Sequence, residues 1–191
     1  MNTFDAIAQR RSIRKFKDTP IADKVIEQLL TAATQAPSGK NTQPWRFVIV
    51  KEDKRAEMVR TMRQGIENLK AQGIDTGSSV WSAKIMEQAP VTIFVFNAHG
   101  KPLGSERTLG ETMWDTVNTQ SIGAAIQNML LAAQDLGIGT LWICDVFSAY
   151  EELCAWLGQT SQMIAAVSLG YPDERPNARP RKTLGEVTTW L

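Results

Sequence analysis

The chain has 191 residues, with 21 Lys or Arg against 20 Asp or Glu and a formal net charge of +1. This length suits one domain, 1–191, with a substantial core. The near-neutral balance argues against binding to nucleic acid or to a membrane surface through the overall charge. Two cysteines and one histidine are too few for a disulfide framework or a Cys/His metal site, so we expect no metal and a reducing, cytoplasmic location.

Helical and strand patterns alternate along the first half of the chain. A short helix with Thr3 as its N-cap is expected before the first arginines, and a second helix over about Asp23–Gln35, where an i, i+3, i+4 apolar stripe ends at "APSG". A strand is expected at Trp45–Val50 and a charged surface helix from Asp53 to about Ala71. The continuous apolar run Val91–Phe96 predicts a strand buried on both faces.

The second half continues this alternation. The segment Asn97–Thr116 is rich in glycine and charge, and we expect it to be mostly loop. The strongest helical pattern runs from about Thr119 to Leu136, followed by a strand at Gly139–Cys144, a helix at Ala149–Gly158 and a strand at Met163–Tyr171. The last twenty residues carry three prolines and are expected to form neither a helix nor a central strand.

The order of these elements indicates an α+β or α/β sandwich. A Rossmann domain is disfavoured, because no G-x-G-x-x-G motif follows a strand. The charge-free stretch before Leu136 is interrupted by amide side chains and reads as a buried helix, not as a membrane span. The N-terminal residues lack the apolar core of a signal peptide, so no export signal is expected.

Two basic clusters lie near the two ends of the chain. The stretch "RRSIRKF" and the stretch "RPNARPRK" hold Arg10, Arg11, Ser12, Arg14, Arg179 and Arg181. Taken alone, such a cluster is most simply a solvated surface. Guanidinium forks beside a hydroxyl also suit the oxygens of a phosphate monoester, so a phosphate-bearing cofactor or substrate is a plausible ligand.

A polar loop, "APSGKNTQPW", separates the second helix from the first strand. Its proline and glycine are explained by turn formation alone. The turn does not require Ser38, Asn41 and Gln43 together, however. Their hydroxyl and amide groups are able to pair with the polar edge of a heterocycle in a mostly apolar pocket.

The blocks "RRSIRKF", "APSGKNTQPWRFVIV", "IGAAIQNMLLAAQDLGIGTLWI" and "GYPDERPNARPRK", in this order, resemble the FMN-dependent nitroreductase family over almost the whole chain. The resemblance implies an α+β fold, an α/β/α sandwich with a central, mainly antiparallel sheet flanked by helices. It further implies a homodimer in which the partner subunit's C-terminal segment completes the fold and FMN lies at the subunit interface. Trp190, near the end of the chain, fits a tail that docks on the partner.

The resemblance also assigns cofactor contacts. Those to the FMN phosphate and ribityl chain would come from Arg10, Arg11, Ser12, Gln120, Arg179 and Arg181. Positive charge near the isoalloxazine would come from Arg14 and Lys84. The polar loop of the other subunit would cover the flavin with Pro37, Ser38, Gly39, Asn41 and Gln43. A backbone N–H at Ile143 or Cys144 would face flavin N5, although many members have Gly or Glu-Gly where Cys144 and Asp145 stand.

By the same resemblance, the expected activity is that of an FMN-dependent oxidoreductase. A hydride from NADH or NADPH passes to flavin N5, and electrons then reach a nitroaromatic, quinone or related small-molecule acceptor by a ping-pong mechanism, with no catalytic side chain required. The alternatives are a reductive dehalogenase, a flavin-consuming enzyme on the same scaffold, or a protein that binds or stores FMN without turnover. Nucleic-acid binding through the arginines is disfavoured by the +1 charge and the absence of a recognition motif.

Overall fold

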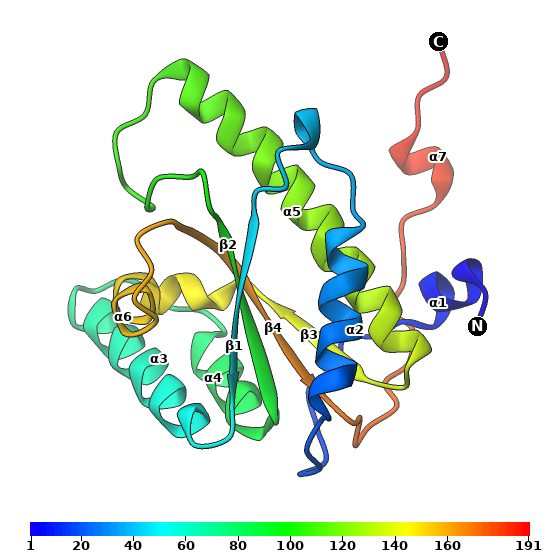
Figure 1. Ribbon diagram of the computed structural model, residues 1–191, viewed down its shortest axis with the longest axis horizontal. Coiled ribbons are helices and arrows are strands. Elements are labelled where there is room, and N and C mark those ends of the chain that lie inside the picture. Colours follow the sequence, from blue (N-terminus) through cyan, green and yellow to red (C-terminus); the bar gives the residue numbers. More distant parts are fainter.

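The apolar run at the middle of the chain forms the central strand β2 (Val91–Asn97), and every residue of it is buried. The computed structural model covers Met1–Leu191 and places β2 in a four-stranded sheet of order β1-β2-β4-β3 (Figure 1). The other strands are β1 (Trp45–Lys51), β3 (Gly139–Ile143) and β4 (Gln162–Gly170). All three neighbouring pairs are antiparallel, which confirms the expected sheet.

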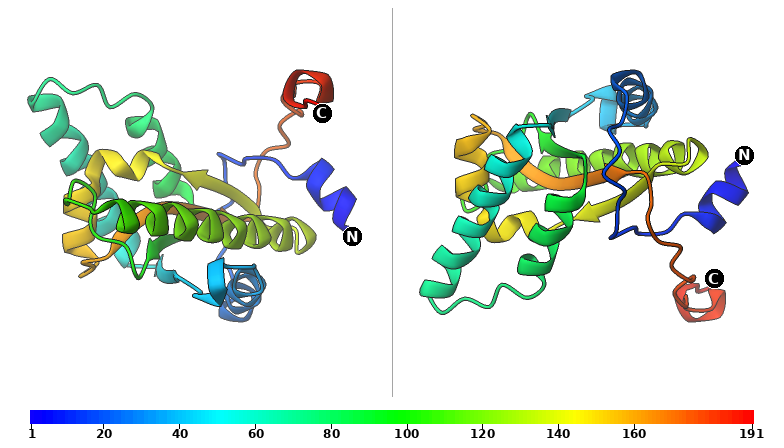
Figure 2. Two further views of the ribbon diagram at one scale, coloured as in Figure 1. Left: turned by 90° about the horizontal axis from the view of Figure 1, so that it is seen from above. Right: turned by 90° about the horizontal axis from the view of Figure 1, so that it is seen from below.

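Helices cover both faces of the sheet, as the edge-on views in Figure 2 show. Because side chains alternate along a strand, Ile93 and Val95 of β2 join one apolar cluster and Phe94 and Phe96 join the other. The first cluster lies under α2 (Asp23–Thr34) and α5 (Leu109–Asp135). The second lies under three helices, α3 (Lys54–Ala71), α4 (Ser79–Gln88) and α6 (Tyr150–Trp156). The expected sandwich of helix, sheet and helix is therefore confirmed.

The expectation for Asn97–Thr116 is wrong in its second part, because α5 begins at Leu109 and not near Thr119. A capping box starts the helix early. The Thr108 hydroxyl accepts the backbone N–H of Glu111 at 3.3 Å, and the Glu111 carboxylate accepts the Thr108 N–H at 2.8 Å. The result is a helix of 27 residues whose first turns project beyond the sheet (Figure 1).

Three smaller differences concern other helices. Helix α4 has no counterpart among the expected elements. Helix α1 (Thr3–Gln9) is capped by Asn2, whose side chain accepts the Asp5 N–H at 2.9 Å, and not by Thr3. The tail, expected to lack helix, contains the single turn α7 (Leu184–Val187), which a second capping box allows despite the prolines before it.

The remaining boundaries agree with expectation to within two residues. No helix has the length and hydropathy needed to cross a membrane.

Glycine at position 65 is required by helix packing. A Cβ there would lie 2.4 Å from both Cα and Cβ of Ala149, so we expect Gly65→Ala to lower the free energy of unfolding by about 1–3 kcal/mol. The control is Gly123→Ala in α5, whose Cβ would meet only Trp142 at 3.8 Å; it should instead gain up to about 1 kcal/mol from helix propensity. Urea unfolding measures both. Equal effects of the two substitutions would contradict this account of the packing.

Candidate functional site

Two segments far apart in sequence lie side by side at the edge of the sheet. Residues 12–17 run along β3 and then pair with residues 171–174: Ile13 N–H donates to the Thr140 carbonyl at 2.9 Å, and Lys17 N–H donates to the Tyr171 carbonyl at 2.9 Å. The Glu174 carboxylate accepts the backbone N–H groups of Arg14 and of Lys15, the latter at 3.2 Å. These bonds bring the two basic clusters together, near the point where both ends of the chain leave the sheet (Figure 2).

A cavity of about 430 Å³ lies between the two segments, and all six residues singled out in the basic clusters line it: Arg10, Arg11, Ser12, Arg14, Arg179 and Arg181. None of the five guanidinium groups forms an ion pair with a carboxylate. Their side chains donate hydrogen bonds only to backbone carbonyls; the Arg11 guanidinium, for example, donates to the Ala8 carbonyl at 2.7 Å. The cavity therefore holds concentrated positive charge without a protein counterion.

The closeness of these positive charges to one another changes the pKa of one arginine. The pKa of Arg10 is lowered, first by burial and then by the positive charges of Arg181 and Arg11. A bound anion would relieve both effects, because it would replace lost hydration and screen the repulsion. With guanidinium donors and the Ser12 hydroxyl on its wall, the cavity fits a phosphate monoester. No group of His, Cys, Asp or Glu side chains is arranged to hold a metal ion.

The polar loop before β1 lies elsewhere, against the first half of α5 (Figure 1). Gly39 N–H donates to the Ser121 hydroxyl at 3.2 Å, and Gln43 N–H donates to the Ser38 hydroxyl at 3.0 Å. Asn41 and Gln43 have φ of 55° and 47°, a left-handed conformation that is unusual outside glycine. The residues lining the arginine cavity include none of Pro37, Ser38, Gly39, Asn41 and Gln43. Within one chain, the structure does not bring these two sets of predicted residues together.

The remaining predicted residues occupy three further places. Lys84 is exposed on α4, with its ammonium 5.9 Å from the centroid of the Trp81 ring. Gln120 is exposed on α5. Ile143, which is buried, ends β3, and Cys144 follows it at the surface. Burial, followed by the charge of Asp145, raises the pKa of the Cys144 thiol, so this cysteine is not an activated thiolate.

Two carboxylates with structural roles near the site were not anticipated from the sequence. Glu174 joins the basic clusters, as described above. Asp145 accepts the hydroxyls of Ser78 at 2.7 Å and Ser82 at 2.6 Å, which ties the end of β3 to the start of α4. Both depend on contacts between segments distant in sequence, and no local motif marks either residue.

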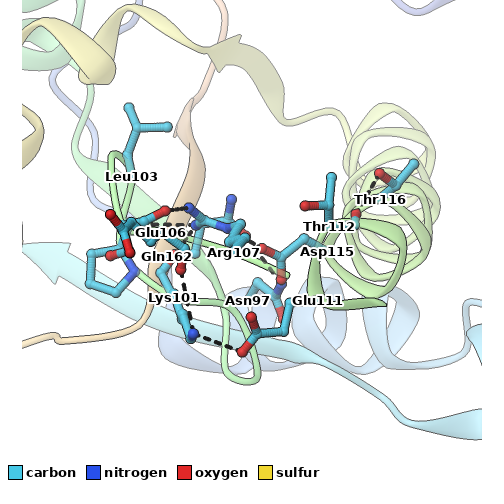
Figure 3. Close-up of polar contacts among 12 residues, drawn as sticks. Asn97, Lys101, Leu103, Glu106, Arg107, Glu111, Thr112, Asp115, Thr116 and Gln162 are labelled. Carbon is cyan, nitrogen blue, oxygen red and sulfur yellow. Dashed lines mark hydrogen bonds and ion pairs between the residues drawn. The ribbon is translucent and has the colours of Figure 1, made fainter. Parts of the chain in front are cut away.

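A polar network fixes the segment between β2 and α5 (Figure 3). Arg107 Nε pairs with Asp115 Oδ2 at 2.6 Å, and the two side chains are only 16% and 15% exposed. The Arg107 guanidinium also donates to the backbone carbonyls of Lys101, Pro102 and Ser105. Lys101 Nζ pairs with Glu111 Oε1 at 2.7 Å. This segment is therefore held on the first turns of α5 by ion pairs as well as by its backbone.

The structure so far defines a class of protein: an antiparallel sheet lies between helical layers, and segments near the two ends of the chain meet around a cavity lined by arginines. The family model described as "Nitroreductase family" matches residues 7–171. The chain belongs to the nitroreductase family.

Similar proteins have been described from several organisms. A protein of Archaeoglobus fulgidus with the provisional name NADH dehydrogenase/NAD(P)H nitroreductase is 32% identical over 88% of this chain and 84% of its own. The iodotyrosine deiodinase of Thermotoga neapolitana is 27% identical over 93% and 92% of the two chains. A provisionally named nitroreductase of Desulfovibrio desulfuricans, solved in complex with FMN, is 27% identical, with a TM-score of 0.76 over 100% of this chain and 97% of its own.

Proposed function

We propose that the protein is an FMN-dependent oxidoreductase that takes electrons from NADH or NADPH and reduces a nitroaromatic, quinone or related acceptor. The observation that carries the proposal is the cavity of five guanidinium groups without carboxylate partners, which fits the phosphate of FMN. The related protein that was solved with FMN supports the choice of cofactor. When bound, FMN supplies a hydride-accepting N5 atom and serves donor and acceptor in turn.

In this proposal the residues of the chain bind and orient the cofactor. Arg10, Arg11, Ser12, Arg179 and Arg181 hold the phosphate and the ribityl chain, together with Gln120. Arg14 and Lys84 direct positive charge toward the pyrimidine side of the ring system, where fixed cations favour an electron-rich cofactor. The backbone at Ile143 and Cys144 faces the reacting edge.

We further propose that the working unit is a homodimer with FMN between the subunits. The support is geometric, because the polar loop with Ser38 and Asn41 does not line the arginine cavity of its own chain. A second subunit would supply that loop to the cofactor. Large apolar side chains on the two terminal segments are also left uncovered in one chain: Phe4 is 84% exposed, Leu184 71% and Trp190 88%. A partner surface would cover such side chains.

A second candidate activity is reductive dehalogenation of an aromatic compound. The similarity to the Thermotoga neapolitana iodotyrosine deiodinase over nearly the full length of both chains favours it specifically. Both activities would use the same cofactor site. They differ in whether the acceptor loses nitro oxygens or a halide, so product analysis separates them.

The test is an anaerobic titration of the FMN-loaded protein with NADPH, then with NADH, followed by a nitroaromatic compound or 3-iodotyrosine. We expect the visible flavin absorbance to bleach with at least one nicotinamide and to return with an acceptor. Flavin that stays oxidised with both nicotinamides would contradict the oxidoreductase proposal and favour an FMN-binding protein without turnover. A protein that takes up no FMN would contradict the cofactor assignment itself.

A further inference from the structure

The carboxylate of Asp145 lies just beyond the end of β3 and has no positively charged partner. Asp145 begins the short 3-10 turn Asp145–Ala149, directly after Cys144. The ion pairs of the chain do not include it, and its side chain is partly buried. Burial of a charge costs free energy unless other contacts offset the cost, so this carboxylate must be stabilised in another way.

Two serine hydroxyls at the start of α4 supply that stabilisation. Ser78 Oγ donates to Asp145 Oδ2 at 2.7 Å, and Ser82 Oγ donates to the same oxygen at 2.6 Å. The two serines are four residues apart, which places them on one face of the first turn of the helix. Ser82 is also buried. The carboxylate is therefore fixed against α4 by two hydrogen bonds that meet at one oxygen.

A neighbouring contact joins the same two elements a second time. Ser79 Oγ donates to the Thr76 carbonyl at 2.6 Å and lies 2.6 Å from Ser148 Oγ, on the far side of the 3-10 turn. Ser79 is buried. With two points of attachment, the turn does not rotate freely about the end of β3. Asp145 is thus held at one place beside the backbone of Cys144.

A charge fixed in this way acts on the groups beside it. The pKa of the Cys144 thiol is raised, first by burial and then by the negative charge of Asp145. This direction is expected, because one negative charge disfavours the formation of a second nearby. The same electrostatic effect applies to any group that gains negative charge next to Cys144.

We propose that Asp145 tunes the reduction potential of bound FMN: held by Ser78 and Ser82, its negative charge makes the cofactor harder to reduce. The inference rests on the proposed function, in which the backbone at Ile143 and Cys144 faces the flavin. Reduction adds negative charge to the cofactor, so a fixed carboxylate nearby opposes it. The effect is opposite in sign to that proposed for Arg14 and Lys84, and it makes the reduced cofactor a stronger electron donor.

Asp145→Asn is the informative substitution. Because one oxygen accepts both hydroxyls, the amide oxygen of asparagine is able to keep both bonds while the charge is lost. At a fixed potential we expect the ratio of reduced to oxidised FMN to rise about three- to tenfold. This corresponds to about 15–30 mV, at about 30 mV per tenfold change for two electrons. Anaerobic reduction by dithionite in the presence of a reference dye measures it without a nicotinamide.

The matched control is Glu151→Gln, which removes one negative charge from the exposed first turn of α6, a few residues further along the chain. It should leave the potential unchanged. An unchanged potential in Asp145→Asn, or an equal rise in both variants, would overturn the proposal.

The reaction of Cys144 with iodoacetamide reports on the same charge in the protein without flavin. Mass spectrometry of the Cys144 peptide excludes the buried Cys154 from the measurement. In Asp145→Asn the rate should reach its half-maximum at a pH lower by about 0.5–1. The double variant Ser78→Ala, Ser82→Ala keeps the charge but no longer holds it, so its profile should shift in the same direction. A double variant that reacts like the unmodified protein would contradict the holding role of the serines.

Failure of this inference is distinguishable from failure of the proposed function. If the dye equilibration shows the expected rise in potential but neither nicotinamide reduces the flavin, the proposed function is overturned and the role of Asp145 stands. If nicotinamides reduce the flavin and the potential does not respond to Asp145→Asn, the role of Asp145 is overturned alone. A protein that binds no FMN would overturn both.

Discussion

Replacing Arg181 with alanine is expected to weaken FMN binding by about 10- to 150-fold, which corresponds to about 1.5–3 kcal/mol for one hydrogen bond to a charged group. The Arg181 side chain donates only to the backbone carbonyls of Arg179 and Pro180, at 3.3 and 3.2 Å, so it has no ion pair to give up when an anion enters. It lies close enough to Arg10 for its charge to lower the Arg10 pKa. Its loss should therefore act on ligand binding and leave the fold intact.

Titrating FMN into the apoprotein and following flavin fluorescence measures this effect. The control is Arg60→Ala, which removes the same charge from the exposed surface of α3, away from the cavity. If Arg60→Ala weakens FMN as much as Arg181→Ala does, the effect is one of overall charge and the cavity is not the phosphate site. An Arg181 variant with unchanged affinity would lead to the same conclusion.

Replacing Glu174 with alanine should have a comparable effect on binding and should also lower stability. The carboxylate accepts two backbone N–H groups, from Arg14 and Lys15, and is the side-chain contact that joins the two basic segments. Without it, the partly buried N–H of Arg14 and the exposed N–H of Lys15 lose their partner, and we expect the free energy of unfolding to fall by about 1.5–3 kcal/mol. FMN affinity should fall by about tenfold, because the backbone bonds of Lys15 and Lys17 would still pair the two segments but the side-chain contact that fixes Arg14 against the C-terminal segment would be lost.

Urea unfolding and FMN titration together test this role, with two comparison variants. Asp173→Ala removes a neighbouring exposed carboxylate that makes no side-chain hydrogen bond, and it should leave both quantities nearly unchanged. Glu174→Gln keeps an acceptor oxygen but removes the negative charge. If Glu174 acted only by repelling the phosphate, both Glu174 variants would bind FMN more tightly than the unmodified protein, and the positioning role would be wrong.

The sequence was most informative where a local pattern has a single physical reading. The apolar run of β2 predicted a strand buried on both faces because no surface position interrupts it. The start of α5 was missed although its signal is local: "TLGE" at Thr108–Glu111 is a capping box, and the surrounding glycine and charge obscured it. Helix α4 was missed because it buries Ser79 and Ser82, polar residues that break the apolar stripe by which an amphipathic helix is found.

The same distinction, between local patterns and contacts that only the folded chain makes, applies to the residues of the candidate site. Guanidinium chemistry made a phosphate-bearing ligand plausible for the two basic clusters, and the family resemblance assigned four of the arginines and Ser12 to the FMN phosphate and ribityl chain and Arg14 to the ring. The structure brings all six residues to one cavity. Glu174 and Asp145 could not be assigned, because their roles arise from the pairing of segments that only the folded chain brings together. Apart from the family resemblance, nothing in the sequence indicated that the polar loop lies away from the arginines of its own chain. The pattern of one chain does not show which contacts a second chain makes.

The bond between Arg14 and Glu174 spans 160 residues, and this separation has a consequence for biosynthesis. At typical translation rates of about 5–20 residues per second, Arg14 waits about 8–32 s for its partner to be made. During that time the early arginines lack the segment that positions them, while the helices and strands between Arg14 and Glu174 are free to form. If the cavity binds the cofactor as proposed, capture of the cofactor would therefore follow translation of at least 174 residues.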